Sequence, residues 1–241
     1  TSYVDVMEVA LRIYPGRALI NSISCEKEKM EALLPIAKKY GAMFVLLPLS
    51  QAGLPKDLEE KKEHIKTVLQ AAREVGLQDN DAIVDVLVTT VGANPTAALE
   101  CFETIAYCKE QLHLPTICGL SNISFGMPQR TFVNTAFLNV ALAKGLTMAI
   151  ANPSQEMLMY TAFATDLLLG KEWASERYLG AVPATAVKVV GAKEEKQDAD
   201  AGAKVVHPIF SCVVKGDKES IIEEVKRAID AGVQPADIIE E

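Results

Sequence analysis

The sequence is poor in the residues that build metal centres and disulfide frameworks. It has three histidines, and its five cysteines form no CxxC motif. No histidine lies at metal-ligand spacing from a pair of cysteines, so the sequence predicts no metal site. We expect the cysteines to be reduced, buried thiols, as is usual in a cytosolic protein: Cys25, Cys101, Cys108, Cys118 and Cys212.

Positive charge is also scarce, and long apolar runs are missing. The 24 Lys and Arg residues against 32 Asp and Glu residues give a formal net charge of -8, which argues against nucleic acid or an anionic membrane as partner. No apolar run of membrane-spanning length and no signal peptide is evident. We therefore expect a cytoplasmic globular protein that binds a small molecule or another protein.

What the sequence does contain is a regular alternation of short apolar runs with longer amphipathic segments. This alternation predicts strand-then-helix units, and hence right-handed crossovers and a parallel sheet. A first helix over 4–14 ends at Pro15 and Gly16. The predicted strands are 17–23, 42–49, 82–89, 115–120 and 147–151, and the helices that follow them are 26–39, 58–75, 95–112, 131–144 and 155–169.

Five such units are compatible with an open, doubly wound sheet or with part of a closed (β/α)8 barrel of the TIM type. No GxGxxG follows the first strand and no GxxxxGK[ST] occurs, so the usual marks of a nucleotide-binding sheet are missing. The barrel is therefore favoured. A complete barrel needs about 250 residues, and residues 1–180 supply five units, so we expect a barrel domain that lacks its first three strands.

The chain changes character after Gly180. Residues 181–206 carry small residues and the charged stretch AKEEKQDADAGAK, which is typical of a linker. Residues 207–241 return to a helical pattern, with Asp217 as N-cap of a helix over 218–231. We expect this short all-α segment to be the beginning of a helical module or a helical hairpin docked on the barrel.

The segment 115–126, PTICGLSNISFG, is the most informative of the strand ends. An apolar run of strand length leads directly into Gly119, Ser121, Asn122 and Ser124. Ligands of parallel α/β proteins bind where strands end and loops begin, so these side chains are expected at a binding site.

Four strings carry a resemblance to a known family. In chain order they are ALINSIS, AGLPKD, AIVDVLVTT and GLSNISFGMPQR, each at a predicted strand end or in the loop after it. Together they resemble the pterin-binding barrel of the folate methyltransferases, and the cobalamin-dependent methionine synthases look most similar. The string FSCVVKGDKESIIEEVKRAIDAGVQPADII is similar to the opening helices of the cobalamin-binding cap module that follows the barrel in those enzymes.

The resemblance implies a function and a set of site residues. It implies transfer of the methyl group of 5-methyltetrahydrofolate to cob(I)alamin, with cobalamin bound by an adjoining module and homocysteine by a zinc module upstream. The family's pterin-binding residues at strand ends match Asn21, Asp85 and Asn122. Asn122 would also be catalytic, hydrogen-bonding N5 as it gains a proton, and the family's loop arginine matches Arg130. Ser124 and Gln129 are weaker candidates for contacts with the folate on the same side of the site as Arg130.

Each of these residues has a structural alternative. Asn21 and Asn122 could cap the following helices, Asp85 could have a purely structural partner, and Arg130 could pair with a surface acid. His64, His113 and His207 are assigned no catalytic role.

Other functions also remain open. The chain could be a non-catalytic scaffold that presents a cobalamin module. It could instead be another pterin-barrel enzyme, such as a corrinoid protein methyltransferase or a dihydropteroate synthase. The synthase would be expected to show a strand-end lysine and a Ser-x-Arg loop late in the barrel, and AIAN at 149–152 does not provide them.

Overall fold

A computed structural model describes residues 3–183, 209, 212 and 218–231 of the 241-residue chain. The chain divides into two compact units, Thr1–Val187 and Lys188–Glu241. The first unit contains an α/β sheet with its helices, and the described part of the second contains the helix α9 (Lys218–Asp230). The site described below lies in the first unit.

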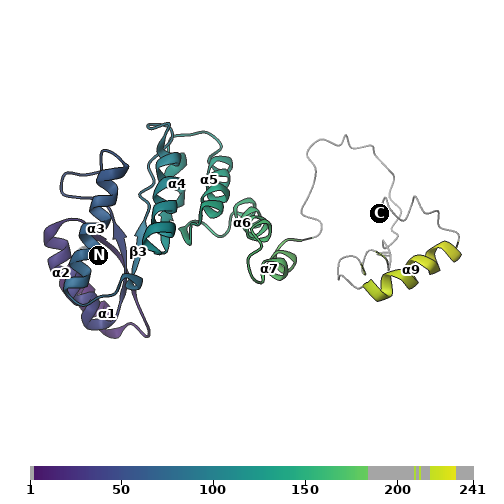
Figure 1. Cartoon of the computed structure of the whole chain (residues 1–241), viewed down its shortest axis with the longest axis horizontal. Coiled ribbons are helices and arrows are strands. Elements are labelled where there is room, and N and C mark those ends of the chain that lie inside the picture. The colour runs from purple at the N-terminus through teal and green to yellow at the C-terminus, as the bar shows by residue number, and fades with distance from the viewer. Residues whose placement is uncertain (1–2, 184–208, 210–211, 213–217, 232–241) are drawn as a thin grey trace. The chain divides into compact units, whose positions relative to one another are not determined.

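The first unit follows the predicted alternation of strands and helices (Figure 1). Its strands are β1 (Leu19–Ser24), β2 (Met43–Leu47), β3 (Ala82–Asp85), β4 (Thr116–Gly119) and β5 (Met148–Ile150). Its α-helices are α1 (Val4–Ile13), α2 (Lys27–Tyr40), α3 (Leu58–Glu74), α4 (Ala97–Tyr107), α5 (Arg130–Lys144), α6 (Glu156–Leu168) and α7 (Ala174–Ala181). A short 3-10 helix, η3 (Leu120–Ser124), joins β4 to the loop before α5.

The five strands are all parallel and lie in the order β1-β2-β3-β4-β5. A doubly wound sheet reverses its strand order at a switch point, whereas a barrel keeps the chain order. Consecutive helices follow the same progression, with α4 beside α5, α5 beside α6 and α6 beside α7 (Figure 1). The arrangement is therefore that of a TIM-barrel-like sheet, as the sequence predicts.

The two faces of the sheet are buried in different ways. One face packs against α2, α3, α4 and α5 through two large apolar clusters, which contain Phe44 and Val84 in one case and Cys118 in the other. The opposite face, which we call the inner face, carries a small cluster of Val45, Ile83 and Ile117 with Met43 against it. No helix residue belongs to this inner cluster among the described residues.

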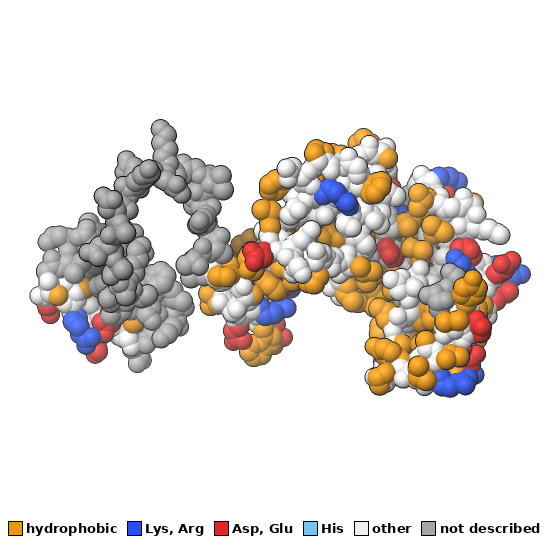
Figure 2. Space-filling model, turned by 180° about the vertical axis from the view of Figure 1, so that it is seen from behind, with side chains coloured by type: hydrophobic (Ala, Val, Ile, Leu, Met, Phe, Trp, Pro, Cys, Tyr) orange, Lys and Arg blue, Asp and Glu red, His pale blue; other side chains and the backbone are white. Residues whose placement is uncertain are grey.

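The inner face is exposed toward both edges of the sheet. Leu19 on β1 is 41% exposed, and Met148 and Ile150 on β5 are 37% and 51% exposed. These side chains point to the inner face because their pairing partners are Met43, Ile117 and Gly119. Figure 2 shows further hydrophobic side chains on the surface of the first unit.

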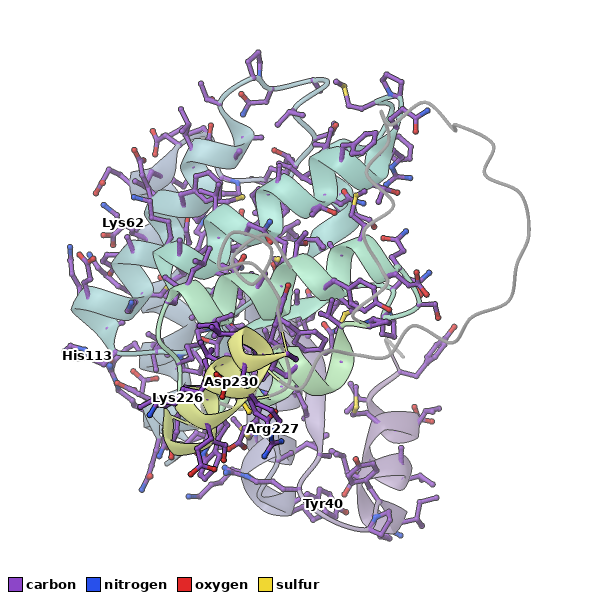
Figure 3. All side chains as sticks on the ribbon, turned by 90° about the vertical axis from the view of Figure 1, so that its right-hand side faces the viewer. Tyr40, Lys62, His113, Lys226, Arg227 and Asp230 are labelled. Atoms are coloured by element: carbon purple, nitrogen blue, oxygen red, sulfur yellow. The ribbon has the colours of Figure 1, made fainter. Side chains whose placement is uncertain are left out.

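Helix ends are fixed by local chemistry that the sequence displays. Asp57 caps α3, because its carboxylate accepts a hydrogen bond of 2.8 Å from the backbone N–H of Glu60. Gly41 and Gly145 adopt the left-handed conformation that ends α2 and α5. The hydroxyl of Tyr40, labelled in Figure 3, donates a hydrogen bond of 3.1 Å to the carboxylate of Glu8 and so connects α2 to α1.

The largest departures from the prediction occur in three elements. Strand β3 ends at Asp85 rather than at Thr89, because the chain turns through the left-handed region at Leu87 (φ 57°). The helix predicted over 95–112 ends as an α-helix at Tyr107 and continues as a π-helical turn over Cys108–Leu112. Helix α7 (Ala174–Ala181) was not predicted, and its first residue follows Trp173, another residue with positive φ.

The second unit is described only in part. Helix α9 matches the helix predicted over 218–231, but Asp217 and residues 184–206 of the predicted linker lie outside the described residues. Within α9, Ala228 is buried while Ile222 and Ile229 are exposed. Across the described residues, no helix combines the length and apolarity that crossing a membrane requires.

Candidate functional site

The candidate site lies at the carboxyl edge of the sheet, where the parallel strands end on one side. The loops that leave this edge follow Ser24, Leu47, Asp85, Gly119 and Ile150. Of the six predicted site residues, Asn21 and Asp85 lie on strands, and the other four lie between the end of β4 and the first residue of α5.

Asp85 is the last residue of β3, and its carboxylate is largely removed from water. One carboxylate oxygen accepts a 2.8 Å hydrogen bond from the backbone N–H of Leu87, which the left-handed turn presents to it. Burial raises the pKa of the Asp85 carboxyl above its ordinary value, and the Leu87 N–H and the charge of Lys61 both oppose this rise. The carboxylate can therefore accept further hydrogen bonds from a ligand, in a site that is partly shielded from water.

Asn122 lies in η3, and its side chain is exposed. The amide folds back toward the end of β4, because a β-carbon built on Gly119 would lie 3.3 Å from Asn122 Nδ2. The absence of a side chain at Gly119 thus lets the amide pack closely against the end of β4. The sequence showed both residues, but it did not show that they contact each other.

Arg130 holds the loop between η3 and α5. Its Nε donates a hydrogen bond of 3.0 Å to the hydroxyl of Ser124, and its Nη2 donates one of 2.6 Å to the carbonyl of Ser121. The buried Ser124 hydroxyl in turn lies 3.3 Å from the same carbonyl, and the guanidinium stacks 5.9 Å from the centre of the Phe125 ring. Arg130 is itself exposed, so one side of its guanidinium faces solvent.

Asn21 and Gln129 are both exposed. Asn21 is in the middle of β1, beside a cavity of about 460 Å³ whose wall includes Ser22, Glu28 and Lys29. Gln129 has positive φ and precedes the first residue of α5, where its side chain makes no capping hydrogen bond.

Strand register brings the side chains of three strands to the inner face. Asn21 pairs with Val45, which pairs with Ile83, two residues before Asp85. Asp85 pairs with Ile117, two residues before Gly119. Because side chains alternate along a strand, Asn21, Asp85 and the amide packed on Gly119 all lie on the inner side of the sheet.

Of the purely structural roles considered for these residues, only the one for Asp85 is observed. The residues before α2 and α5 are Glu26 and Gln129, so neither Asn21 nor Asn122 caps the helix that follows its strand. Arg130 donates to Ser124 and Ser121 and forms no ion pair within the described residues. Asp85 does have a structural partner, the Leu87 N–H.

Lys61 is a further residue of interest that was not predicted from the sequence; it is 4% exposed although it is charged. Lys61 lies in the first turns of α3, and its Nζ donates 3.4 Å to the carbonyl of Val86. A signal was present, because Lys61 is on the apolar stripe of α3 with Ile65, Val68 and Ala72.

The structure describes two of the three histidines. His64 is half-buried on α3, with Nδ1 3.3 Å from the carbonyl of Pro48. His113, labelled in Figure 3, is exposed and directly follows the π-helical turn Cys108–Leu112. His207 is outside the described residues.

The cysteines differ in their exposure. Cys101, Cys108 and Cys118 are buried, whereas Cys25 and Cys212 are partly exposed. No group of three His, Cys, Asp or Glu side chains suited to a metal ion occurs in the described part of the chain.

Comparison with known proteins identifies the family. Residues 1–152 match the family described as pterin binding enzyme. The chain belongs to the pterin-binding enzyme family. The strand order and the polar carboxyl edge described above agree with this membership.

One protein of similar sequence and one solved structure of similar fold can be compared with this chain. A methylcorrinoid:tetrahydrofolate methyltransferase from Eubacterium limosum is 28% identical over 179 residues, which cover 72% of this chain and 65% of the relative. The crystal structure of a dihydropteroate synthase from Clostridium difficile, determined in the presence of pteroic acid, has a TM-score of 0.54 and 21% identity. That likeness covers 69% of this chain and 64% of the synthase, and it concerns the fold alone. This chain therefore spans somewhat under two thirds of the length of each.

Proposed function

We propose that the first unit binds a reduced folate at the carboxyl edge of its sheet and serves methyl transfer between N5 of the folate and a protein-borne corrinoid. The observation that carries the proposal is the position of the Asp85 carboxylate and the Asn122 amide on the same side of neighbouring strands. The family and the name of the Eubacterium relative support the same two substrates.

The side chains at this edge suit the polar edge of a pterin. That edge presents an amino group, ring N–H groups and a carbonyl, so it needs acceptors beside donors. Asp85 supplies acceptors, and the carboxamides of Asn21 and Asn122 supply one donor and one acceptor group each. The exposed side of Arg130 offers a cation to an anionic or carbonyl part of the folate, and the exposed Gln129 lies beside it. Ser124, predicted to face the folate, is buried and instead supports Arg130 by accepting a hydrogen bond from its Nε.

The chemical step requires a change of protonation at N5. When the C–N bond breaks toward the corrinoid, the bonding electron pair remains on N5, and a tertiary amine is a poor leaving group unless it gains a proton or a strong hydrogen bond. Asn122 can donate or accept through its amide and so follow this change without itself titrating. The bound corrinoid supplies the nucleophile in this direction and the methyl group in the other.

We assign the direction from 5-methyltetrahydrofolate to cob(I)alamin, as a step in methionine synthesis from homocysteine. The support is the resemblance of residues 210–239 to the opening of a cobalamin-binding cap module, together with the helix α9 formed within that segment. On this assignment residues 1–180 are the folate domain, 181–206 a linker and 207–241 the beginning of the cap module. Cobalamin is then held by the adjoining module and homocysteine by a zinc module upstream.

A second candidate function is methyl transfer in the reverse direction. The Eubacterium relative is named for the reverse transfer, from a methylcorrinoid to tetrahydrofolate. The same residues would serve either direction, since the forward and reverse reactions pass through one transition state. A dihydropteroate synthase or a non-catalytic scaffold would be distinguished from both by the absence of methyl transfer.

Equilibrium binding and single-turnover transfer test the proposal. The 241-residue chain should bind 5-methyltetrahydrofolate, and Asp85→Asn should weaken binding about tenfold or more, as expected for loss of a charge-assisted hydrogen bond. Mixed with free cob(I)alamin, the chain should yield methylcobalamin and tetrahydrofolate. A chain that binds folate but transfers no methyl group would support a scaffold, and formation of dihydropteroate from its precursors would support a synthase.

A further inference from the structure

Lys61 is the one buried lysine among the described residues. It projects from α3, the helix before β3, and within the described residues its ammonium group makes one hydrogen bond, the 3.4 Å contact with the Val86 carbonyl. No ion pair joins Lys61 to a carboxylate in the part of the chain that the structure describes. A buried cation with so few partners is costly, so its position needs an explanation.

The Val86 carbonyl that Lys61 contacts belongs to the turn that supports Asp85. The backbone N–H of Val86 is bound in the sheet, donating 3.0 Å to the carbonyl of Ile117. Leu87 then enters the left-handed region and directs its N–H to the Asp85 carboxylate. Lys61 therefore fixes the residue between the carboxylate and the N–H that orients it.

The titratable groups near Asp85 come from three elements. Lys61 on α3 is the cation whose field acts on the carboxylate. Cys101 on α4 and Cys118 on β4 also lie within electrostatic reach of Asp85, and burial raises the pKa of Cys101 to about 11 and that of Cys118 to about 12. Both thiols are therefore neutral at physiological pH, and Lys61 is left as the charged neighbour.

We propose that Lys61 is a positioning residue that keeps Asp85 ionised and correctly oriented for the bound pterin. The interpretation of Asp85 as a pterin ligand rests on the proposed function, whereas the coupling between Lys61 and Asp85 does not. Lys61 acts in two ways, through its charge and through its hydrogen bond to the Val86 carbonyl. An ionised Asp85 accepts N–H groups from the ligand, but a protonated one presents a competing O–H.

Three substitutions separate the charge from the hydrogen bond. Lys61→Arg keeps both, Lys61→Gln keeps a donor without the charge, and Lys61→Met removes both while retaining an unbranched apolar chain. Lys66→Met is the matched control, because Lys66 is on the same helix but exposed and paired with Glu63 at 2.9 Å. Replacing a buried charge by an apolar chain of similar size is often tolerated, so Lys61→Met is expected to fold.

The decisive measurement is the titration of the Asp85 carboxyl carbon by NMR in the 241-residue chain carrying carbon-13-labelled aspartate. Asp85→Asn identifies the signal. The midpoint should move upward by about one pH unit in Lys61→Met and Lys61→Gln, as expected on loss of a nearby opposite charge. It should stay at the parent value in Lys61→Arg and Lys66→Met. An unchanged midpoint in Lys61→Met would overturn the inference.

Folate binding gives a second, separable result. The pH below which 5-methyltetrahydrofolate binding is lost should rise together with the carboxyl midpoint. If the parent chain binds no folate, the proposed function fails, but the NMR midpoints still decide the coupling. If Lys61→Met does not fold, the double variant Lys61→Met/Asp85→Asn should fold, since the uncompensated carboxylate is gone. A double variant that also fails to fold would count against the inference.

Discussion

The amide of Asn122 packs directly against Gly119, with its Nδ2 only 3.3 Å from the position that a β-carbon at residue 119 would take. Gly119 has φ -76°, a conformation open to any residue, so its value at this position lies in its small size and not in its backbone freedom. The contact connects the end of β4 to the side chain that we assign to N5 of the folate.

Gly119→Ala should therefore impair methyl transfer without impairing the fold. The added methyl group would meet Asn122 Nδ2 at 3.3 Å and displace the amide by a few tenths of an ångström, and misplacement of a reacting group by about 1 Å can cost on the order of a hundredfold in rate. We expect a loss of about tenfold in the single-turnover rate. Gly180→Ala is the control, because nothing lies within 4 Å of its β-carbon position. A parent-like rate in Gly119→Ala would show that the contact is not required.

Asn122→Ala should affect the rate constant more than folate affinity. If the amide binds N5 most strongly as the proton arrives, its loss removes an interaction made mainly in the transition state. Removal of one preorganised hydrogen-bonding group of this kind costs on the order of 3 kcal/mol, or roughly a hundredfold in rate. Single-turnover transfer at saturating folate, measured beside equilibrium binding, separates the two effects. Transfer at the parent rate would reduce Asn122 to a binding residue.

The order of the elements could be predicted from the sequence because each unit carries its own signals. Apolar runs such as 43–47 are long enough for a buried strand, and Gly41 and Gly145 mark the ends of helices. Parallel strands joined by single helices then leave few arrangements. The inner-face position of Asp85 also follows from alternation along a strand, once its register is known.

Other features of the site depend on contacts that leave little local signal. Val86, Leu87 and Val88 continue an apolar run, so nothing in the sequence indicates that Leu87 takes positive φ and ends β3 early. The burial of Lys61 depends on the packing of α3 over the end of β3, because a lysine on a helical stripe can equally extend its charge into water. Helix α7 has eight residues, too few for periodicity to identify.

Asp85→Asn should stabilise the ligand-free chain as pH rises. Because the pKa of Asp85 is raised in the folded state, the native chain binds more protons than the unfolded chain between the ordinary pKa and the raised one. The contribution of Asp85 to stability is thus fully present below the ordinary pKa and is lost as pH rises through the raised pKa. The uncharged Asn keeps an acceptor for the Leu87 N–H and escapes this loss.

The measurement is the unfolding free energy of parent and variant in urea from pH 4 to pH 8. The difference in favour of Asp85→Asn should grow with pH and then level off above the raised pKa. Stabilisation in the absence of ligand, combined with weaker folate binding, would mark Asp85 as a residue retained for binding. A difference that shrinks as pH rises would contradict the direction of the pKa shift.

The cysteines should react in two groups. Burial raises the pKa of Cys101 to about 11 and the pKa values of Cys108 and Cys118 to about 12, so almost none of these thiols is ionised at pH 8. Since the thiolate is the reactive form, only the partly exposed Cys25 and Cys212 should be labelled by iodoacetamide in the native chain. Peptide mass spectrometry before and after unfolding in urea would check this, and rapid native labelling of Cys118 would contradict it.

The exposed inner face should make the 241-residue chain self-associate. β1 and β5 each have a single strand neighbour within the described residues, so each leaves one edge of backbone N–H and C=O groups unpaired. Leu19 and Met148 add exposed apolar surface at these two edges. Sedimentation velocity should therefore show dimers or larger species at micromolar concentration, and Leu19→Gln and Met148→Gln should each weaken association by about 1 kcal/mol, or about fivefold.

Leu99→Gln is the matched control, since Leu99 is 59% exposed but lies on α4, away from the inner face. A monodisperse monomer, or an equal effect of Leu99→Gln, would show that the inner face does not drive association.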